Sequence, residues 1–95
     1  MTSKQRARLR ALANPLDTLF QIGKGGVSEN LLAQLDDLLR ARELIKIRVL
    51  ETAGTPAAEL GSGLAEALRA ECVQVIGSRI ILYRRNPEKK DGITL

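Results

Sequence analysis

The sequence of 95 residues contains no histidine, no tryptophan and a single cysteine, Cys72. One cysteine cannot form an intramolecular disulfide and makes a cysteine-based metal site implausible, and it fits a reducing compartment. There is also no serine–base pair and no pair of acids facing a predicted pocket. A small hydrolase is therefore the least favoured function class, and we expect no enzyme activity, no cofactor, no metal and no small-molecule substrate.

Aromatic residues and long apolar runs are scarce as well. Phe20 and Tyr83 are the only aromatics, so the core must be aliphatic. A base-stacking platform like that of the RNA-recognition motif is disfavoured. Tyr83 could stack on a base, but half-buried packing is the simpler explanation. No apolar stretch approaches the roughly 20 residues that span a membrane, and no apolar run follows the basic N-terminus as in a signal peptide. We therefore expect a cytoplasmic protein without a membrane partner.

Charge is distributed unevenly along the chain. Lysine and arginine total 15 against 11 acids, for a net charge of +4. Residues 1–10 and 79–90 are strongly basic, whereas residues 51–71 are mainly acidic. A chain polarised in this way should have a basic and an acidic side, and a basic side suits a polyanion.

Hydrophobic periodicity predicts seven elements. Thr2 and Gln5 form a capping-box pattern for the first helix, Ser28 is a possible cap for the second, and Thr55 for the third. Gly77 and Ser78 match a two-residue hairpin turn between the last strands. The predicted elements are a helix over 3–13, a strand over 19–22, a helix over 28–41, a strand over 44–50, a helix that begins around residue 56, and strands over 72–76 and 79–84.

The order α-β-α-β-α-β-β predicts an α/β (α+β) two-layer sandwich with a four-stranded mixed sheet. Strand–helix–strand crossovers should give parallel neighbours, and the final hairpin makes the last strand antiparallel. The second and third helices should cover one face. We expect one domain over 1–86 and a polar, flexible tail over 87–95.

Gly23, Lys24, Gly25 and Gly26 connect a predicted strand to a helix. Glycines allow positive φ and close approach of a ligand, the first amides of a helix attract anions, and Lys24 adds a positive charge. An RNA phosphate fits these features. From these four residues alone, however, a plain glycine turn that connects two elements is the favoured interpretation, and the pattern is not a P-loop.

Other basic residues indicate RNA contact more strongly as a set than singly. Lys46 and Arg48 lie on the polar side of a strand, where solvated charges are ordinary. Arg79 and either Arg84 or Arg85 lie on the last strand, and the basic first helix should pack nearby. Together, such cations could neutralise several phosphates of one polyanion.

Six short segments carry a combined pattern in their order and spacing. They are Lys4-Gln5-Arg6, Leu9-Arg10-Ala11-Leu12-Ala13, Gln21-Ile22-Gly23-Lys24-Gly25-Gly26, Glu43-Leu44-Ile45-Lys46-Ile47-Arg48-Val49-Leu50, Val73-Gln74-Val75-Ile76-Gly77 and Leu82-Tyr83-Arg84. Together these segments resemble the YhbY-like, CRM-domain family of RNA-binding proteins. The resemblance covers roughly residues 2–85.

The resemblance implies a fold like the C-terminal domain of bacterial translation initiation factor three. It also implies association with precursors of the large ribosomal subunit, as for stand-alone bacterial members. The family's Gly-x-x-Gly loop corresponds to residues 23–26, which makes RNA contact there the favoured interpretation. Gly61 and Gly63 stand where the family resemblance implies a more helix-favouring sequence. This departure puts the length of the third helix in question.

The sequence therefore predicts a non-enzymatic RNA-binding protein. Its partners would be structured ribosomal RNA and the precursor of the 50S particle, and it would act as a monomer in large-subunit assembly. The alternative is a protein-interaction adaptor that uses the acidic face without touching RNA. The candidate RNA-binding residues are Gly23, Lys24, Gly25, Gly26, Lys4, Arg6, Arg8, Arg10, Lys46, Arg48, Arg79 and Arg84.

Overall fold

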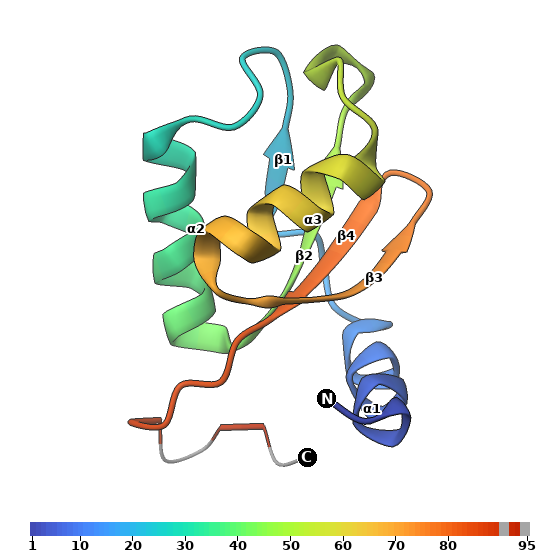
Figure 1. The fold of residues 1–95 in the computed structure, drawn as a ribbon, viewed down its shortest axis with the longest axis vertical. Helices are drawn as coiled ribbons and strands as arrows, with labels where there is room; N and C mark the ends of the chain where they lie inside the picture. The colour runs from blue at the N-terminus through green and yellow to red at the C-terminus, as the bar shows by residue number, and fades with distance from the viewer. Residues whose placement is uncertain (90–91, 94–95) are drawn as a thin grey trace.

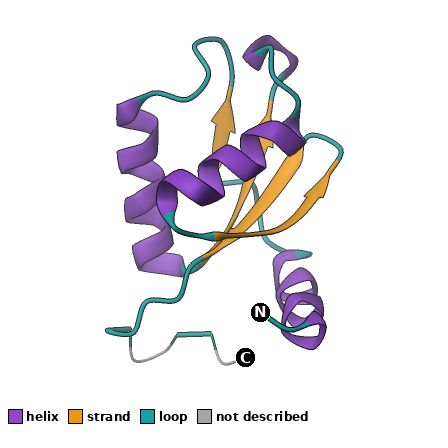
Figure 2. Ribbon diagram, in the orientation of Figure 1, coloured by secondary structure: helices purple, strands orange, loops and turns teal. Residues whose placement is uncertain are grey.

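The computed structural model describes residues 1–89, 92 and 93. Its elements confirm the predicted order and the mixed four-stranded sheet (Figures 1 and 2). None of the helices in this described part is long and apolar enough to cross a membrane. The elements are α1 (Ser3–Ala13), β1 (Phe20–Ile22), α2 (Glu29–Arg42), β2 (Leu44–Val49), the 3-10 helix η1 (Glu51–Ala53), α3 (Ala57–Leu68), β3 (Glu71–Ile76) and β4 (Arg79–Tyr83).

Side-chain caps fix the starts of α1 and α2. The Thr2 hydroxyl accepts from the Gln5 N–H at 3.1 Å, and the Gln5 side chain accepts from the Thr2 N–H at 3.0 Å, which confirms the capping box. Ser28 accepts from a backbone N–H in the first turn of α2 at 3.1 Å. The prediction that Thr55 caps α3 is wrong. Pro56 occupies the N-cap position without a side-chain bond, so Thr55 lies one residue too early.

The strands lie in the order β1-β2-β4-β3. β1 and β2 are parallel, and β4 is antiparallel to both of its neighbours. The expectation that β2 and β3 are neighbours is therefore wrong, because β4 lies between them. The reason is burial: residues 80–83 are buried on both faces, whereas β3 has exposed residues at both ends. The more apolar strand takes the central position.

The two faces of the sheet are covered differently. As predicted, α2 and α3 pack on one face, over alternate strand residues such as Ile45, Ile47 and Ile80. α1 packs on the opposite face, where Leu9 and Ala13 contact a smaller cluster. This helix adds a partial third layer to the predicted two. The residues of the sheet that α1 covers are Leu44, Val73, Ile81 and Tyr83.

α3 is continuous through both of its glycines, so the departure from the family pattern does not shorten it. A Cβ on Gly61 would lie 3.1 Å from the Cys72 sulfur and 3.2 Å from Val75 Cγ2. A Cβ on Gly63 would meet nothing within 4 Å. Gly61 therefore permits the close approach of α3 to β3, while Gly63 faces open space.

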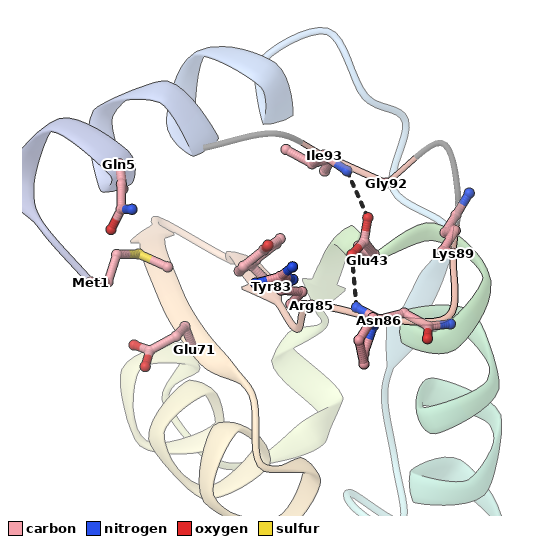
Figure 3. A pocket seen from close by; sticks show the side chains of 11 residues that line it. Met1, Gln5, Glu43, Glu71, Tyr83, Arg85, Asn86, Lys89, Gly92 and Ile93 are labelled. Atoms are coloured by element: carbon pink, nitrogen blue, oxygen red, sulfur yellow. Dashed lines mark hydrogen bonds between the residues drawn. The ribbon is translucent and has the colours of Figure 1, made fainter.

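The segment after β4 returns to the end of α2. Glu43 is only 1% exposed, and its carboxylate accepts from the N–H groups of Asn86 and Ile93, both at 2.7 Å (Figure 3). Ile93 also packs against the cluster beneath α1. Of the tail expected to be flexible, residues 90, 91, 94 and 95 lie outside the described residues.

Candidate nucleic-acid interface

The part of the sheet that α1 leaves uncovered carries a row of side chains across all four strands. In the strand pairing, Gln21 lies opposite Arg48, Arg48 opposite Arg79, and Arg79 opposite Ile76. Both arginines are exposed. Like charges in directly opposite positions repel each other, and this row contains no acid. An anion between the two guanidinium groups would relieve the repulsion.

A second row lies closer to α1 and forms the floor of a groove. Lys46 lies opposite Ile81, which lies opposite Gln74. The Lys46 ammonium donates to the carbonyl of Asn14 at 3.1 Å and so fixes the end of α1 beside β2. The groove has a volume of 440 Å³ and three cations against one carboxylate. It is lined by Arg10, Asn14, Leu16, Asp17, Thr18, Lys46, Gln74, Ile76, Arg79 and Ile81.

The four basic residues of α1 do not share one role. Lys4, Arg8 and Arg10 are exposed. Arg6 instead donates from one guanidinium nitrogen to the carbonyl of Cys72 at 2.9 Å and to that of Val73 at 3.2 Å. Its other nitrogen lies 3.7 Å from the carboxylate of Glu71. Arg6 therefore attaches α1 to the edge strand β3, a structural role that the sequence did not indicate.

These two carbonyls belong to a β-bulge that changes which residues of β3 face the groove. The pairing with β4 shifts between Cys72 and Gln74, so Val73 is the extra residue. As a result Gln74 and Ile76 face the uncovered side, and Val75 faces α3. Strict alternation would not have given this arrangement. Gln74 and Ile76 are the groove residues that sequence reasoning missed.

The glycine loop forms a tight turn at the end of β1. The Gly26 N–H donates to the Gly23 carbonyl at 2.9 Å, and Gly25 and Gly26 have φ values of 101° and 60°. Lys24 is exposed in the turn. Gly23 lies beside Thr52 of η1. Because β1 and β2 are parallel, the loop lies at the end of the sheet where Arg48 and Arg79 lie (Figure 1).

The structure places Arg84, another candidate from the sequence, away from this surface. Its guanidinium donates to the Asp36 carboxylate at 2.7 Å, to the Asp36 carbonyl at 3.1 Å and to the Leu68 carbonyl at 2.9 Å. These bonds join the end of β4 to α2 and α3. The hydrogen bond from Arg84 holds the pKa of Asp36 below its ordinary value, helped by the charges of Arg84 and Arg40 against the opposing effect of burial. Arg84 is thus a residue of the fold, and Asp36 is more than a solvated acid.

A family model for the CRS1/YhbY (CRM) domain matches residues 1–84, nearly the whole chain. The chain belongs to this family. The match confirms the resemblance found in the sequence.

Relatives of this CRM domain come from several bacteria. It is 40% identical over 90 residues to the "Probable RNA-binding protein YqeI" of Bacillus subtilis, covering 95% of this chain and 94% of that protein. It is 30% identical over 90 residues to an "RNA-binding protein" of Haemophilus influenzae, covering 95% of this chain and 91% of that protein. Among solved structures it resembles SAV1595 of Staphylococcus aureus, with a TM-score of 0.77 and 46% identity over 98% and 97% of the two chains.

A larger cavity of 590 Å³ lies between the start of α1, the end of β4 and residues 85–89, 92 and 93 (Figure 3). Tyr83 and Glu43 line it, but both are almost fully buried and serve the fold. Because Tyr83 packs beneath α1, it is not available to stack on a base. Within the described residues, no group of histidine, cysteine or acidic side chains could hold a metal.

The thiol of Cys72 shows no sign of activation. Burial raises its pKa, and the lowering by the charge of Arg6 and the raising by Glu71 are smaller effects. A reactive cysteine requires a lowered pKa, because the thiolate is the nucleophile. The raised pKa therefore makes Cys72 of this CRM domain a poor candidate for a nucleophile.

Proposed function

We propose that this protein is a non-enzymatic RNA-binding protein of the cytoplasm, which as a monomer binds structured ribosomal RNA and assists assembly of the large ribosomal subunit. The observation that carries the proposal is the opposed pair Arg48 and Arg79 on an uncovered sheet face. The relatives named RNA-binding proteins support RNA as the polyanion.

The cations suited to this role lie on or beside one surface. Lys46 and Arg10 line the groove next to the arginine pair, and Lys24 is at the same end of the sheet. Each phosphate neutralised by such a cation releases counterions from the RNA, which is the main source of affinity for nucleic acids. We therefore include Lys4, Lys24, Arg8, Arg10, Lys46, Arg48 and Arg79 with the loop glycines Gly23, Gly25 and Gly26 in the proposed interface. We leave out Arg6 and Arg84 because each has a part-buried guanidinium group bonded to several partners, whereas the bond from Lys46 to the Asn14 carbonyl is exposed to solvent.

The acidic side lies elsewhere and explains why an adaptor is the weaker alternative. Glu59 and Glu66, the charged residues of α3, are exposed on the helix that covers the opposite face of the sheet. Because these acids lie on the far side of the sheet, they compensate little of the positive electrostatic potential of the basic face. An RNA would approach the α1 side, and a protein partner of the adaptor type would approach the α3 side.

Salt dependence tests the RNA proposal directly. About six phosphate contacts should make the affinity of the purified protein for large-subunit ribosomal RNA fall roughly a thousandfold between about 50 and 200 mM salt. Arg48→Ala and Arg79→Ala should each weaken binding and reduce the salt slope by about one. Arg69→Ala, which removes an exposed charge at the end of α3, is the matched control and should bind like the wild type.

The same variants separate binding from folding. Since Arg48 and Arg79 repel each other across the strands, either alanine variant should keep or slightly raise the thermal midpoint, by the equivalent of about 0.2–1 kcal/mol at low salt. Weaker RNA binding with an undiminished midpoint would support a functional pair. Absence of RNA binding at low salt, or an equal loss in Arg69→Ala, would contradict the proposal.

The role in assembly has its own test. Under gentle low-salt lysis, the protein should co-sediment with precursors of the large subunit rather than with mature translating ribosomes. Gradient fractionation with immunodetection gives this distribution, and the Arg48→Ala,Arg79→Ala double variant should shift toward the free fractions. Wild-type protein found only in the free fractions would remove the assembly role and leave RNA binding to be judged by the affinity measurements.

A further inference from the structure

We propose that the groove between the end of α1 and strand β3 holds one unpaired nucleotide, so that the protein prefers RNA with a bulged or looped base over a fully paired helix. The inference rests on the proposed RNA binding and adds what that surface recognises. Its occupant is a nucleotide because the groove combines cations, a side-chain amide and an exposed apolar residue at one place.

The first part of the argument is the charge on one side of the groove. Arg79 belongs both to the groove and to the opposed arginine pair with Arg48. A phosphate bound between these two guanidinium groups would therefore lie at the border of the groove. Ile76 lies opposite Arg79 on the neighbouring strand β3. Neighbouring strands are about 4.8 Å apart, so the backbones at Ile76 and Arg79 are close together. The base of a nucleotide held by this phosphate can reach that strand.

The second part is the chemistry of the groove wall. Ile76 is 53% exposed, although an isoleucine in a strand of this small domain would ordinarily be covered. It offers apolar surface to the face of a base. Gln74 lies in the adjacent row, half-buried, and its side-chain amide can donate to and accept from the edge of a base. Among the described residues, neither Gln74 nor Arg79 makes a side-chain hydrogen bond or ion pair.

The third part is why the base must be unpaired. The narrow, deep major groove of an RNA helix keeps base edges away from side chains, so sequence-specific proteins take bases that are splayed out of the stack. Proteins stack such a base on an arginine guanidinium plane as well as on an aromatic ring, and Arg10 and Arg79 border this groove. Its 440 Å³ falls in the range of about 300–1,000 Å³ typical of small-ligand sites.

The bulge in β3 gives a structural reason for this arrangement. Without the extra residue Val73, Gln74 would face α3 instead of the groove. Arg6 satisfies the two carbonyls at the bulge and so stabilises the local geometry. The feature that positions Gln74 and Ile76 is thus held by α1, the same helix that forms the opposite wall.

The test compares a fully paired RNA duplex with the same duplex carrying one bulged nucleotide, with each base used in turn at the bulge. The wild type should bind the best bulged RNA about tenfold more tightly than the paired one, the discrimination that one good base contact supplies. Gln74→Ala and Ile76→Ser should remove most of this preference by weakening binding to the bulged RNA far more than binding to the paired duplex. Gln21→Ala, the same residue type on the same face at the other edge of the sheet, is the matched control and should retain the preference.

The outcomes distinguish this inference from the proposed function. Equal affinity for paired and bulged RNA, with binding retained, would overturn the nucleotide site and leave the RNA-binding function intact. No binding to either RNA at low salt would overturn both. Self-association that Ile76→Ser abolishes, measured by sedimentation at increasing concentration, would assign the groove to a second copy and overturn the inference. Loss of preference in Gln74→Ala with a wild-type thermal midpoint would support it.

Discussion

The carboxylate of Glu43 accepts a hydrogen bond from the backbone N–H of Asn86 across 2.7 Å, although 43 residues separate them in the chain. Its other oxygen accepts from the N–H of Ile93 at the same distance. Glu43 also ends α2 with a positive φ of 65°, and its carbonyl accepts from the N–H of Arg84. The two backbone N–H groups replace the water that this side chain would bind if it were exposed. One acid therefore joins the end of a helix, the exit of β4 and the C-terminal segment.

Replacing this carboxylate by an amide should destabilise the protein. In Glu43→Gln, one acceptor oxygen becomes an NH₂ group facing a backbone N–H, and that donor loses its partner. We expect a loss of about 1–3 kcal/mol in the free energy of unfolding, measured by urea denaturation at neutral pH. Glu66→Gln, an exposed position on α3, is the control and should change stability by less than about 0.5 kcal/mol. Equal midpoints for the two variants would show that the buried bonds contribute nothing net.

The two glycines of α3 should respond differently to alanine. Gly63 faces open space in a helix, so Gly63→Ala should stabilise the protein by about 0.5–1 kcal/mol through helix propensity alone. At Gly61 the new methyl group would lie 3.1 Å from the Cys72 sulfur, closer than ordinary contact. We therefore expect Gly61→Ala to lose most or all of that gain. Thermal melts of the pair provide the measurement, and a Gly61→Ala midpoint equal to that of Gly63→Ala would mean that α3 shifts freely on β3.

The bond between Arg84 and Asp36 should make stability depend on acid pH. Because the folded state lowers the pKa of Asp36, it binds its proton less readily than the unfolded state does. The bond therefore stabilises the fold above the ordinary pKa of an aspartate, and this contribution is lost as the pH falls through the folded value. In Arg84→Met, the pKa of Asp36 should rise toward its ordinary value and the acid dependence should flatten.

Carboxyl NMR titration of Asp36 and urea midpoints at pH 5 and 3 would measure these two effects. Arg85→Met, which removes the neighbouring exposed arginine, should leave the Asp36 titration unchanged. A wild-type midpoint that falls between pH 5 and 3 no more than that of Arg84→Met would show that the bond is broken in solution.

Local patterns in the sequence were sufficient for the elements of this fold. The alternation of Lys46 and Arg48 with buried Ile45 and Ile47 placed the two cations on one face, as the structure shows. The cap at Thr2 was equally local, since its partner Gln5 is three residues away. In each case the pattern involves residues that are only a few positions apart in the sequence.

The tertiary roles of the arginines could not be predicted in this way. Arg6 bonds to carbonyls 66 and 67 residues away, and Arg84 bonds to Asp36, 48 residues away. Nothing near either arginine in the chain distinguishes it from an exposed one such as Arg79. The bulge at Val73 could not be predicted from the sequence either. Its residues are ordinary strand formers, and only the pairing with β4 creates the bulge. The charge pattern thus indicated a basic surface, but it did not distinguish the cations exposed on that surface from those that bond within the fold.

The glycine loop provides the last prediction, because there binding and folding can be separated by one side chain. Lys24 is exposed in a turn whose shape depends on the glycines and on the bond from Gly26 to Gly23. Lys24→Ala should therefore change stability by less than about 0.5 kcal/mol. If Lys24 contacts a phosphate, the variant should bind all RNA sequences uniformly more weakly and lower the salt slope by about one. Gly25→Ala is less informative, since its φ of 101° makes any side chain strained.

RNA affinity and the thermal melt of Lys24→Ala should be measured together at one fixed salt concentration, beside the control Arg69→Ala. Both variants remove one exposed positive charge, so their net charges are equal and any difference in affinity reports position alone. Weaker binding in Lys24→Ala only, with both melts unchanged, is the expected result. Identical affinities would make the loop a connector between β1 and α2. RNA contact would then depend on α1 and on the arginine pair of the open sheet face.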